Sequence, residues 1–240
     1  MRLFEWDGGG RYRVAFSTRL GGVSEGSSES LNLGIVTAEE PENVVENRTR
    51  LCASVEADPH DATMAWQVHG SNVTEADARG IVTPGTVYER CDGLWTDQAR
   101  RALVLLTADC FPVALVRTSG SPRLAVLHVG WRGLLEGIAD AGVAALQGNG
   151  IAAAVGPGIG ACCYEVGEEV SEPFRRRFGD DVVSGRRLDL GLATERALLE
   201  AGCTTVERNG RCTSCEADLF FSHRRDRGRT GRQGVIAYIA

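Results

Sequence analysis

Two histidines and one cysteine are the residues of this chain whose types and positions best fit metal chemistry. His69, Cys110 and His128 each lie at or beside the end of an apolar run, where a buried strand would reach the surface. Two imidazoles and one thiolate form a three-ligand zinc set that leaves a fourth position open for water or substrate. The three residues are too far apart in the sequence for a zinc finger, so only a folded domain could bring them together.

The same residues allow two other hypotheses. Cys110 with His128 also suits nucleophilic catalysis, as in a thiol hydrolase or amidase that needs no metal. A non-enzymatic module with a structural zinc is the third hypothesis, although structural sites normally have four protein ligands. Asp109, directly before Cys110, could orient a ligand or serve as a general base.

The residues after His128 predict an anion site. Gly130-Trp131-Arg132-Gly133 stands at the start of an expected helix, and an arginine beside a helix N-terminus suits phosphate. All 26 basic residues are arginine, so Schiff-base chemistry and a Walker-type phosphate lysine are excluded. Phosphate recognition must therefore depend on arginine, backbone amides or a metal.

Two motifs further along the chain give weaker functional signals. The glycine loop at 156–160 has GxGxG rather than GxGxxG spacing, so we expect it to place Cys162 or Tyr164 beside a pocket instead of binding a dinucleotide. Cys212 and Cys215 form a single CxxC pair with no second pair at zinc-finger spacing. This isolation predicts packed or weakly redox-active thiols.

Other conspicuous residues are given structural roles. We expect a turn over 92–97, although Asp92 and Asp97 place two carboxylates there. The basic stretch within 220–232 fits a substrate-phosphate contact or an ion-pair network better than a nucleic-acid patch, because the net charge is −6. Three cysteines without a motif are expected to be small packed residues: Cys52, Cys91 and Cys203.

Composition places the chain among ordinary globular proteins. Of its 240 residues, 43% are apolar and 24% are charged, which allows a sizeable core. The N-terminus lacks the apolar segment of a signal peptide, and the uncharged stretch 141–164 is too rich in glycine for a membrane-spanning helix. We therefore expect a soluble cytoplasmic protein whose cysteines do not form a disulfide framework.

The elements that must position the candidate donors mix strands and helices. We expect strands at 12–16, 64–68, 103–107, 112–116, 124–129, 151–155, 205–207 and 234–239. We expect helices at 39–55, 133–146, 166–178 and 190–201. Because no regular βαβ rhythm is present, an α+β fold is favoured over a doubly wound sheet.

Taken together, the motifs resemble one protein family. They are Thr18-Arg19-Leu20-Gly21-Gly22-Val23, Ser30-Leu31-Asn32-Leu33-Gly34, Gln67-Val68-His69-Gly70, the stretch 92–97, Thr107-Ala108-Asp109-Cys110, His128-Val129 with the four residues after it, the loop 156–167, and Phe220-Phe221-Ser222-His223-Arg224-Arg225. In this order they resemble the purine nucleoside phosphorylase family that is also labelled multicopper polyphenol oxidase or laccase-domain proteins.

The resemblance implies a single domain over 1–240 with mixed β-sheets flanked by helices in a four-layer α/β/β/α arrangement. It also implies a zinc site formed by His69, Cys110 and His128. The implied activities are phosphorolysis of adenosine, inosine and S-methyl-5′-thioadenosine, and hydrolytic deamination of adenosine. We expect purine nucleosides and inorganic phosphate as partners, with no nucleic acid or membrane, in a monomer or weak homo-oligomer.

Residue roles follow from the implied reactions. Zinc would lower the pKa of the water that attacks C6 of adenosine. In phosphorolysis, Arg132 and Arg19 could hold the phosphate, and Asp109 could donate or relay a proton to the purine. We expect Cys110 to be a metal ligand and not a covalent nucleophile.

A copper-dependent polyphenol oxidase is a further hypothesis, which the residues disfavour. Multicopper oxidation needs many more histidines than the four of this chain. Blue-copper electron transfer needs an axial methionine, and neither Met1 nor Met64 is a good candidate. Zinc is therefore the expected metal.

Overall fold

Long apolar runs form the central strands of the protein, whose structure is a computed structural model that describes every residue except 36, 38 and 84. The strands β6 (Leu103–Thr107), β8 (Leu124–Val129) and β9 (Ile151–Val155) have the predicted bounds. Their residues are buried on both faces, which explains why the sequence shows continuous apolar runs instead of alternation.

The strands form two mixed sheets. One has six strands in the order β12-β9-β7-β8-β5-β4, and the other has five in the order β1-β2-β13-β6-β3. The remaining bounds are β1 (Leu3–Trp6), β2 (Tyr12–Ser17), β3 (Thr63–Met64), β4 (Val73–Glu75), β5 (Gly93–Thr96), β7 (Phe111–Arg117), β12 (Cys203–Arg208) and β13 (Gln233–Ile239). A separate ladder pairs β10 (Val183–Ser184) with β11 (Arg187–Leu188).

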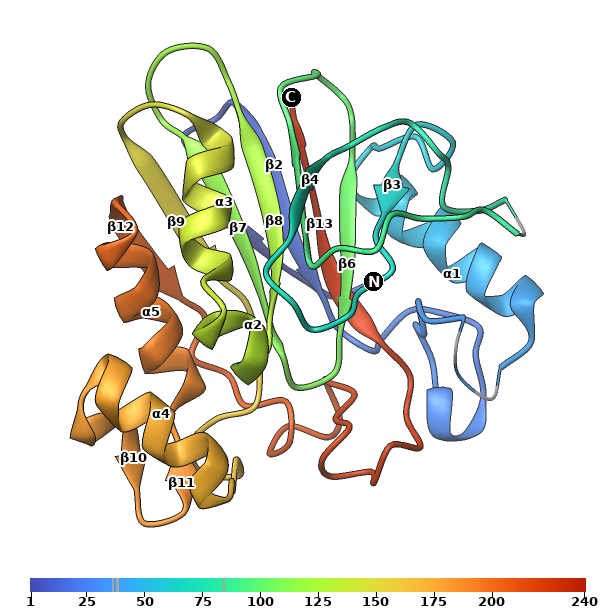
Figure 1. Ribbon diagram of the computed structural model, residues 1–240. Coiled ribbons are helices and arrows are strands. Elements are labelled where there is room, and N and C mark those ends of the chain that lie inside the picture. Colours follow the sequence, from blue (N-terminus) through green and yellow to red (C-terminus); the bar gives the residue numbers. More distant parts are fainter. Residues whose placement is uncertain (36, 38, 84) are drawn as a thin grey trace.

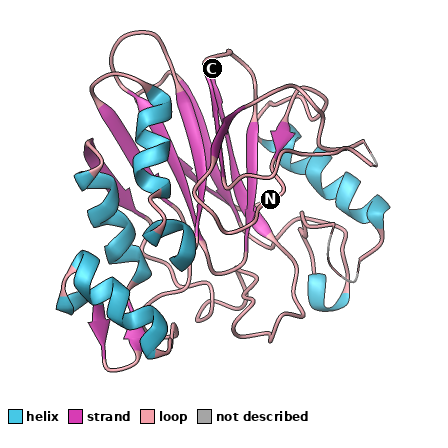
Figure 2. Ribbon diagram, in the orientation of Figure 1, coloured by secondary structure: helices cyan, strands magenta, loops and turns pink. Residues whose placement is uncertain are grey.

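Helices cover the outer faces of the two sheets (Figures 1 and 2). On the five-stranded sheet lies α1 (Pro41–Ser54). The six-stranded sheet is covered by α2 (Trp131–Leu135), α3 (Ile138–Leu146), α4 (Glu168–Phe178) and α5 (Leu190–Glu200). In the described part of the chain, no helix is long and apolar enough to span a membrane.

Alternation along β8 shows how the layers pack. Leu124 and Val126 face the core between the two sheets, whereas Ala125, Leu127 and Val129 face the core under the helices. A third core lies between the five-stranded sheet and α1. The layers are therefore helix, sheet, sheet and helix, and the predicted four-layer α+β fold is confirmed.

Three local predictions differ from the structure. The helix expected at 133–146 is divided into α2 and α3 because Gly137 adopts a left-handed conformation, with φ +90°, where α2 ends. The strand expected at 64–68 is limited to Thr63–Met64, after which the chain leaves the sheet. The turn expected at 92–97 is the strand β5, which pairs with β8 and so lies inside the six-stranded sheet.

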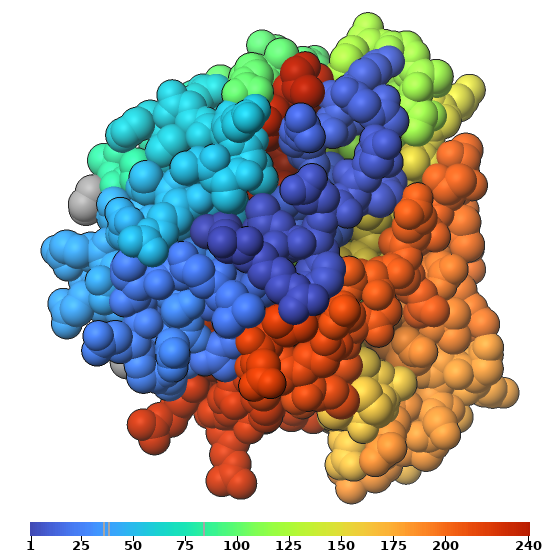
Figure 3. Space-filling view, turned by 180° about the vertical axis from the view of Figure 1, so that it is seen from behind, coloured from blue at the N-terminus to red at the C-terminus, as the bar shows by residue number. Residues whose placement is uncertain are grey.

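Three connections between the sheets surround the candidate donors, and two of them carry His69 and Cys110. They join β3 to β4, β6 to β7 and β12 to β13. Thr107 pairs with Gln233 and Phe111 pairs with Val129, so the connections meet at the end of the sandwich away from the C-terminus (Figure 1). Seen from behind, the orange-red connection from β12 to β13 covers this lower end, beside the blue N-terminal region (Figure 3).

Candidate metal centre

His69, Cys110 and His128, which we call the donor triad, come together at this end of the sandwich. His69 lies between β3 and β4, Cys110 lies between β6 and β7, and His128 is near the end of β8. Their ligand atoms all lie within 4.8 Å of one another. The two imidazole rings meet edge to face, with centroids 4.8 Å apart. His69 is exposed while His128 is buried, so the triad can be reached from solvent on the His69 side.

A buried carboxylate, Asp92, orients both histidines. It accepts hydrogen bonds from three consecutive backbone N–H groups, those of Val68, His69 and Gly70, at 3.1, 2.9 and 2.8 Å. Its Oδ1 also lies 2.8 Å from Nδ1 of His128. Burial by itself would raise the pKa of Asp92, but the hydrogen bonds from His128 and the backbone lower it below its ordinary value. Because an ionised carboxylate only accepts hydrogen bonds, Nδ1 of His128 donates and Nε2 is free to bind a metal.

Asp109 has a different set of partners. Its carboxylate accepts hydrogen bonds from Oγ1 of Thr213 at 2.7 Å and from the backbone N–H of Arg224 at 2.6 Å. These hydrogen bonds tie Asp109, which directly precedes Cys110, to the β12–β13 connection. The orienting role that the sequence suggests for Asp109 is therefore filled by Asp92. The only sequence signal for Asp92 is an Asp-Gly pair, which is also typical of a turn.

Two glycines after His128 allow the backbone to approach the triad. A Cβ atom at Gly130 would lie 3.1 Å from Sγ of Cys110. A Cβ atom at Gly133 would lie only 2.5 Å from the carbonyl oxygen of Gly70, in the loop that carries His69. The start of α2 thus packs directly on this loop, and the glycine spacing of the motif follows from that contact.

The side chain of Gln67 fixes the other side of the same loop. Its Nε2 donates to the carbonyl oxygen of Leu106 at 2.7 Å, and its Oε1 accepts from the N–H of Leu106 at 2.9 Å. Beyond the end of β3, the side-chain amide thereby makes the hydrogen bonds to β6 that the backbone of a neighbouring strand would make. This contact holds the His69 loop beside the strand that leads to Cys110.

Cys110 and His128 each shift the pKa of the other. Burial by itself would raise the pKa of the Cys110 thiol, but the neighbouring His128 and His69 lower it to about 6. Burial would likewise lower the pKa of His128, but the Cys110 thiolate and the Asp92 carboxylate raise it. The geometry therefore stabilises a thiolate between two imidazoles, which is the protonation state of cysteine that binds metals.

Tyr164 and Arg232 lie in the electrostatic field of the triad. Burial raises the pKa of Tyr164 to about 12, and the charge of Cys110 adds to this effect, so the phenol stays protonated at neutral pH. Burial lowers the pKa of Arg232, whereas Asp109 and Cys110 act to raise it. The sequence predicts a pocket beside Tyr164 and places Arg232 in a basic stretch, but it links neither residue to Cys110.

Arg132 and Arg19, the arginines predicted to bind phosphate, have different surroundings. Arg132 is exposed on α2, with its guanidinium carbon 5.4 Å from the ring centroid of Trp131. Arg19 is half-buried and donates from Nε to the carbonyl oxygen of Glu29 at 2.6 Å and from Nη1 to that of Ala217 at 3.1 Å. Because Arg19 already holds two backbone carbonyls, Arg132 is better placed to reach an anion from solvent.

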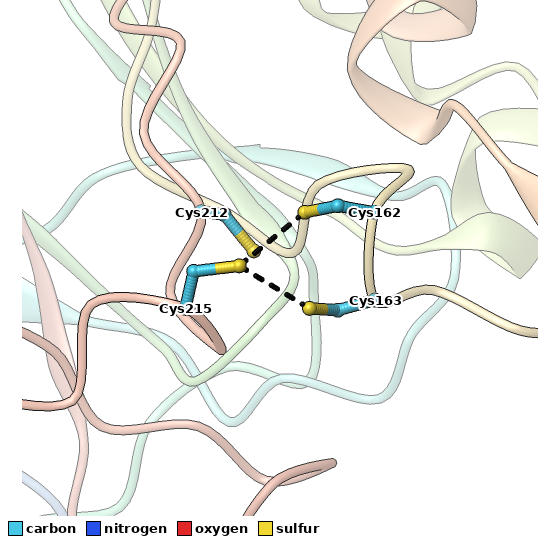
Figure 4. A group of neighbouring side chains, drawn as sticks. All are labelled: Cys162, Cys163, Cys212 and Cys215. Atoms are coloured by element: carbon cyan, nitrogen blue, oxygen red, sulfur yellow. Dashed lines mark hydrogen bonds between the residues drawn. The ribbon is translucent and has the colours of Figure 1, made fainter.

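Four other cysteines form a second group, which we call the cysteine cluster (Figure 4). Cys162 and Cys163 lie in the turn after β9, whereas Cys212 and Cys215 lie between β12 and β13. The expectation that Cys212 and Cys215 are an isolated pair is therefore wrong, because a second pair comes from a distant segment. The remaining cysteines outside the donor triad are buried, as predicted: Cys52, Cys91 and Cys203.

Comparison with known sequences identifies relatives of nearly full length. Residues 13–240 match the family described as multi-copper polyphenol oxidoreductase laccase. The chain is 35% identical to a purine nucleoside phosphorylase of Pseudomonas aeruginosa, over 98% of this chain and 96% of that protein. It is 37% identical to the purine nucleoside phosphorylase YlmD of Geobacillus stearothermophilus, over 94% of this chain and 89% of that protein.

Solved structures show the same fold. The hypothetical protein YfiH of Bacillus licheniformis matches with a TM-score of 0.93 and 32% identity, over 99% of this chain and 96% of that one. YlmD of Geobacillus stearothermophilus matches with a TM-score of 0.88 and 34% identity, over 96% of this chain and 92% of that one. The similarity therefore covers both sheets and the end of the sandwich that carries the donors.

Proposed function

This chain belongs to the family described as multi-copper polyphenol oxidoreductase laccase, and from that premise we propose that it is a zinc-dependent purine nucleoside phosphorylase. The observation that carries the proposal is the donor triad, with two imidazoles and a thiolate within 4.8 Å of one another. Relatives named purine nucleoside phosphorylase align with nearly the whole chain. We propose adenosine, inosine and S-methyl-5′-thioadenosine as substrates with inorganic phosphate, and adenosine deamination as a second activity.

The donor set fits zinc better than copper. Three protein donors with an orienting carboxylate and solvent access are typical of catalytic zinc. Multicopper oxidation requires more histidines, and the two outside the triad, His60 and His223, are exposed and belong to neither donor group among the described residues. Met64 is buried in the core beside α1, which disfavours axial ligation. These observations argue against a polyphenol oxidase.

The protein's own groups would hold the metal and its surroundings in place. His69, Cys110 and His128 would be the ligands, and Asp92 would fix the ring of His128. When bound, zinc supplies Lewis-acid chemistry, which stabilises negative charge and favours ionisation of water at neutral pH. Such chemistry suits the attack of water on C6 of adenosine during deamination.

Phosphorolysis requires an anion site and a proton for the departing purine. Arg132 is our primary phosphate ligand, and Arg19 is the second because two of its nitrogens already bind backbone carbonyls. Asp109 adjoins Cys110, and we propose it as the relay that passes a proton to the purine. Its carboxylate already accepts hydrogen bonds from Thr213 and Arg224, so the proton that it relays must be taken up from solvent.

A second candidate function uses the same atoms without a metal. Cys110 would be the nucleophile, His128 its base, and Asp92 the group that orients the imidazole. The hydrogen bond between His128 and Asp92 supports this arrangement. His69 has no role in it, since a thiol hydrolase needs only one imidazole beside the cysteine, and for that reason we rank it second.

The test is a phosphate-dependence assay on the purified enzyme. We expect adenosine and inosine to give free base and ribose 1-phosphate only when phosphate is supplied. Chelation should abolish the activity and added zinc should restore it. We expect Arg132→Ala to raise the KM for phosphate about 10- to 100-fold, the effect of losing one charged hydrogen bond. Arg176→Ala, an exposed arginine on α4, is the matched control.

Each model has an outcome that contradicts it. Full activity in metal-stripped protein, with inactivation by iodoacetamide, would replace the zinc enzyme with the thiol hydrolase. An unchanged KM for phosphate in Arg132→Ala would remove that arginine from the site while leaving the activity intact. The predictions of a cytoplasmic enzyme that is a monomer or weak homo-oligomer, without nucleic-acid or membrane partners, stay part of this proposal.

A further inference from the structure

The cysteine cluster brings four thiols together from two segments that are far apart in the sequence. Their sulfur atoms all lie within 4.8 Å of one another. Sγ of Cys215 is 3.4 Å from Sγ of Cys162 and also 3.4 Å from Sγ of Cys163. All four side chains point toward a common centre (Figure 4). Cys212 and Cys215 approach from one side, and the adjacent Cys162 and Cys163 approach from the other.

Backbone geometry supports this convergence. The N–H of Cys163 donates to the carbonyl oxygen of Gly160 at 2.9 Å, which closes the turn that presents both adjacent thiols. The N–H of Gly160 donates to Sγ of Cys212 at 3.2 Å. A Cβ atom at Gly160 would lie 3.2 Å from Sγ of Cys162 and 3.4 Å from Sγ of Cys212, so glycine leaves room for the two sulfurs. Hydrogen bonds from backbone N–H groups to sulfur are a usual means of stabilising metal thiolates.

We propose that the cysteine cluster binds a second metal ion, a zinc held by four thiolates in a structural site. Four thiolates are the donor set of structural zinc, with Zn–S bonds of about 2.3 Å and tetrahedral geometry. This geometry separates the sulfur atoms by about 3.8 Å, which is close to the spacing seen here. On binding, each thiol releases its proton to solvent and forms one Zn–S bond, and no group is oxidised or reduced.

The proposed ion would fasten together two loops that border the donor triad. Gly158 pairs with Cys212, and the N–H of Thr213 donates to the carbonyl oxygen of Gly158 at 2.9 Å. Thr213, inside the CxxC segment, also donates to the carboxylate of Asp109. A single hydrogen bond, from Thr213 to Asp109, thereby links the CxxC segment to the residue beside Cys110. The function of the cysteine cluster would be to hold these loops in place, since all four coordination positions are filled by protein.

Metal analysis of the whole protein tests the proposal. We expect about two zinc ions per chain when the protein is loaded and freed of excess metal, one for each donor group. Cys215→Ser should remove one of them, and Ser214→Ala, in the same CxxC segment, should remove none. His69→Ala/His128→Ala should keep the zinc of the cysteine cluster. Loss of that ion in Cys215→Ser but not in the histidine variant separates this proposal from the proposed enzymatic function.

Cobalt substitution gives a second readout that does not depend on the folding of a cysteine variant. Cobalt added to the metal-free His69→Ala/His128→Ala protein should give the intense sulfur-to-metal charge-transfer absorption of a tetrathiolate site. A wild-type protein that holds one zinc and keeps it in Cys215→Ser would overturn the proposal. A cysteine-cluster disulfide found by mass spectrometry in the purified, unoxidised protein would overturn it as well and would make the cluster a redox pair.

Discussion

The donor triad and the cysteine cluster lie at the same end of the sandwich but differ in construction. The triad has two nitrogens and one sulfur. Cys110 directly precedes β7 and His128 is near the end of β8, whereas His69 is on the loop between β3 and β4. The cluster has four sulfurs, and its ligands stand on turns and loops. A buried carboxylate orients the triad, whereas the backbone N–H of Gly160 donates to a sulfur of the cluster.

The difference shows how position in the fold can separate two uses of similar side chains. Cys110 and His128 are held by the six-stranded sheet, and the loop of His69 is held by Asp92 and Gln67, so three donors can stay in place without a fourth from the protein. Loops have less support from their surroundings, and in the proposed site of the cysteine cluster a fourth protein donor would compensate for this. Variants that affect one group while sparing the other test this contrast.

The largest effect is expected for Cys110→Ala. Loss of the triad thiolate should release the zinc there and lower kcat/KM about 1,000-fold or more, because Lewis acidity contributes several kcal/mol to such reactions. Elemental analysis should still find the zinc of the cysteine cluster. Cys203→Ala removes a buried thiol from β12 and is the control, which should keep both ions and its activity. Loss of both ions in Cys110→Ala would contradict the independence of the two groups.

An intermediate effect is expected for Asp92→Asn. Asparagine keeps the size of the side chain but loses the charge that holds Nδ1 of His128, so the zinc dissociation constant of the triad should rise about 10- to 100-fold. Competition with a chromophoric chelator measures this constant. Asp97→Asn, at the other end of β5, removes only an exposed carboxylate 3.5 Å from Arg123 and should change nothing measurable. An Asp92→Asn protein with unchanged affinity would show that the carboxylate does not orient the ligand.

The smallest effect on activity is expected for Thr213→Val. This change keeps the side-chain shape but removes the hydroxyl that donates to Asp109 at 2.7 Å. We expect the free energy of unfolding to fall by about 1–3 kcal/mol, because a buried carboxylate loses a donor, and kcat/KM to fall less than tenfold. Thr49→Val, whose exposed hydroxyl on α1 bonds only to the preceding turn, is the control for chemical denaturation. Equal denaturation midpoints for the two variants would remove the link between the cysteine cluster and the triad.

Much of the scaffold could be predicted because its signals are local. β6, β8 and β9 were given their bounds by continuous apolar runs, which follow from burial between two layers. Gly137 was not recognised as the end of α2, because a helical pattern continues on both sides of it. The strand predicted at 64–68 is shorter in the structure for a different reason, because Gln67 bonds to Leu106 of β6 with its side chain instead of its backbone.

The donor groups show where sequence reasoning reaches its limit. The donor triad was proposed from residue types at strand ends, and the structure brings those three residues together. Asp92 was missed because its three backbone donors are contiguous with His69 and distant from Asp92 itself. The partners of Cys212 and Cys215 were missed because Cys162 and Cys163 are brought near only when β9 and β12 pair. The available signal was the presence of two closely spaced cysteine pairs, Cys162-Cys163 and Cys212-Cys215, in a chain whose cysteines are not expected to form disulfides.

The placement of donors on connections between sheets also bears on the order of folding. His69 and Cys110 lie where the chain passes from the five-stranded to the six-stranded sheet, and His128 belongs to the latter. A zinc finger is organised around its ion from the start, but these donors meet only after the two sheets have packed. Such packing depends on pairings between distant strands, as between β2 and β13, which form slowly. We therefore expect metal uptake at the triad to be a late event that marks the completed sandwich.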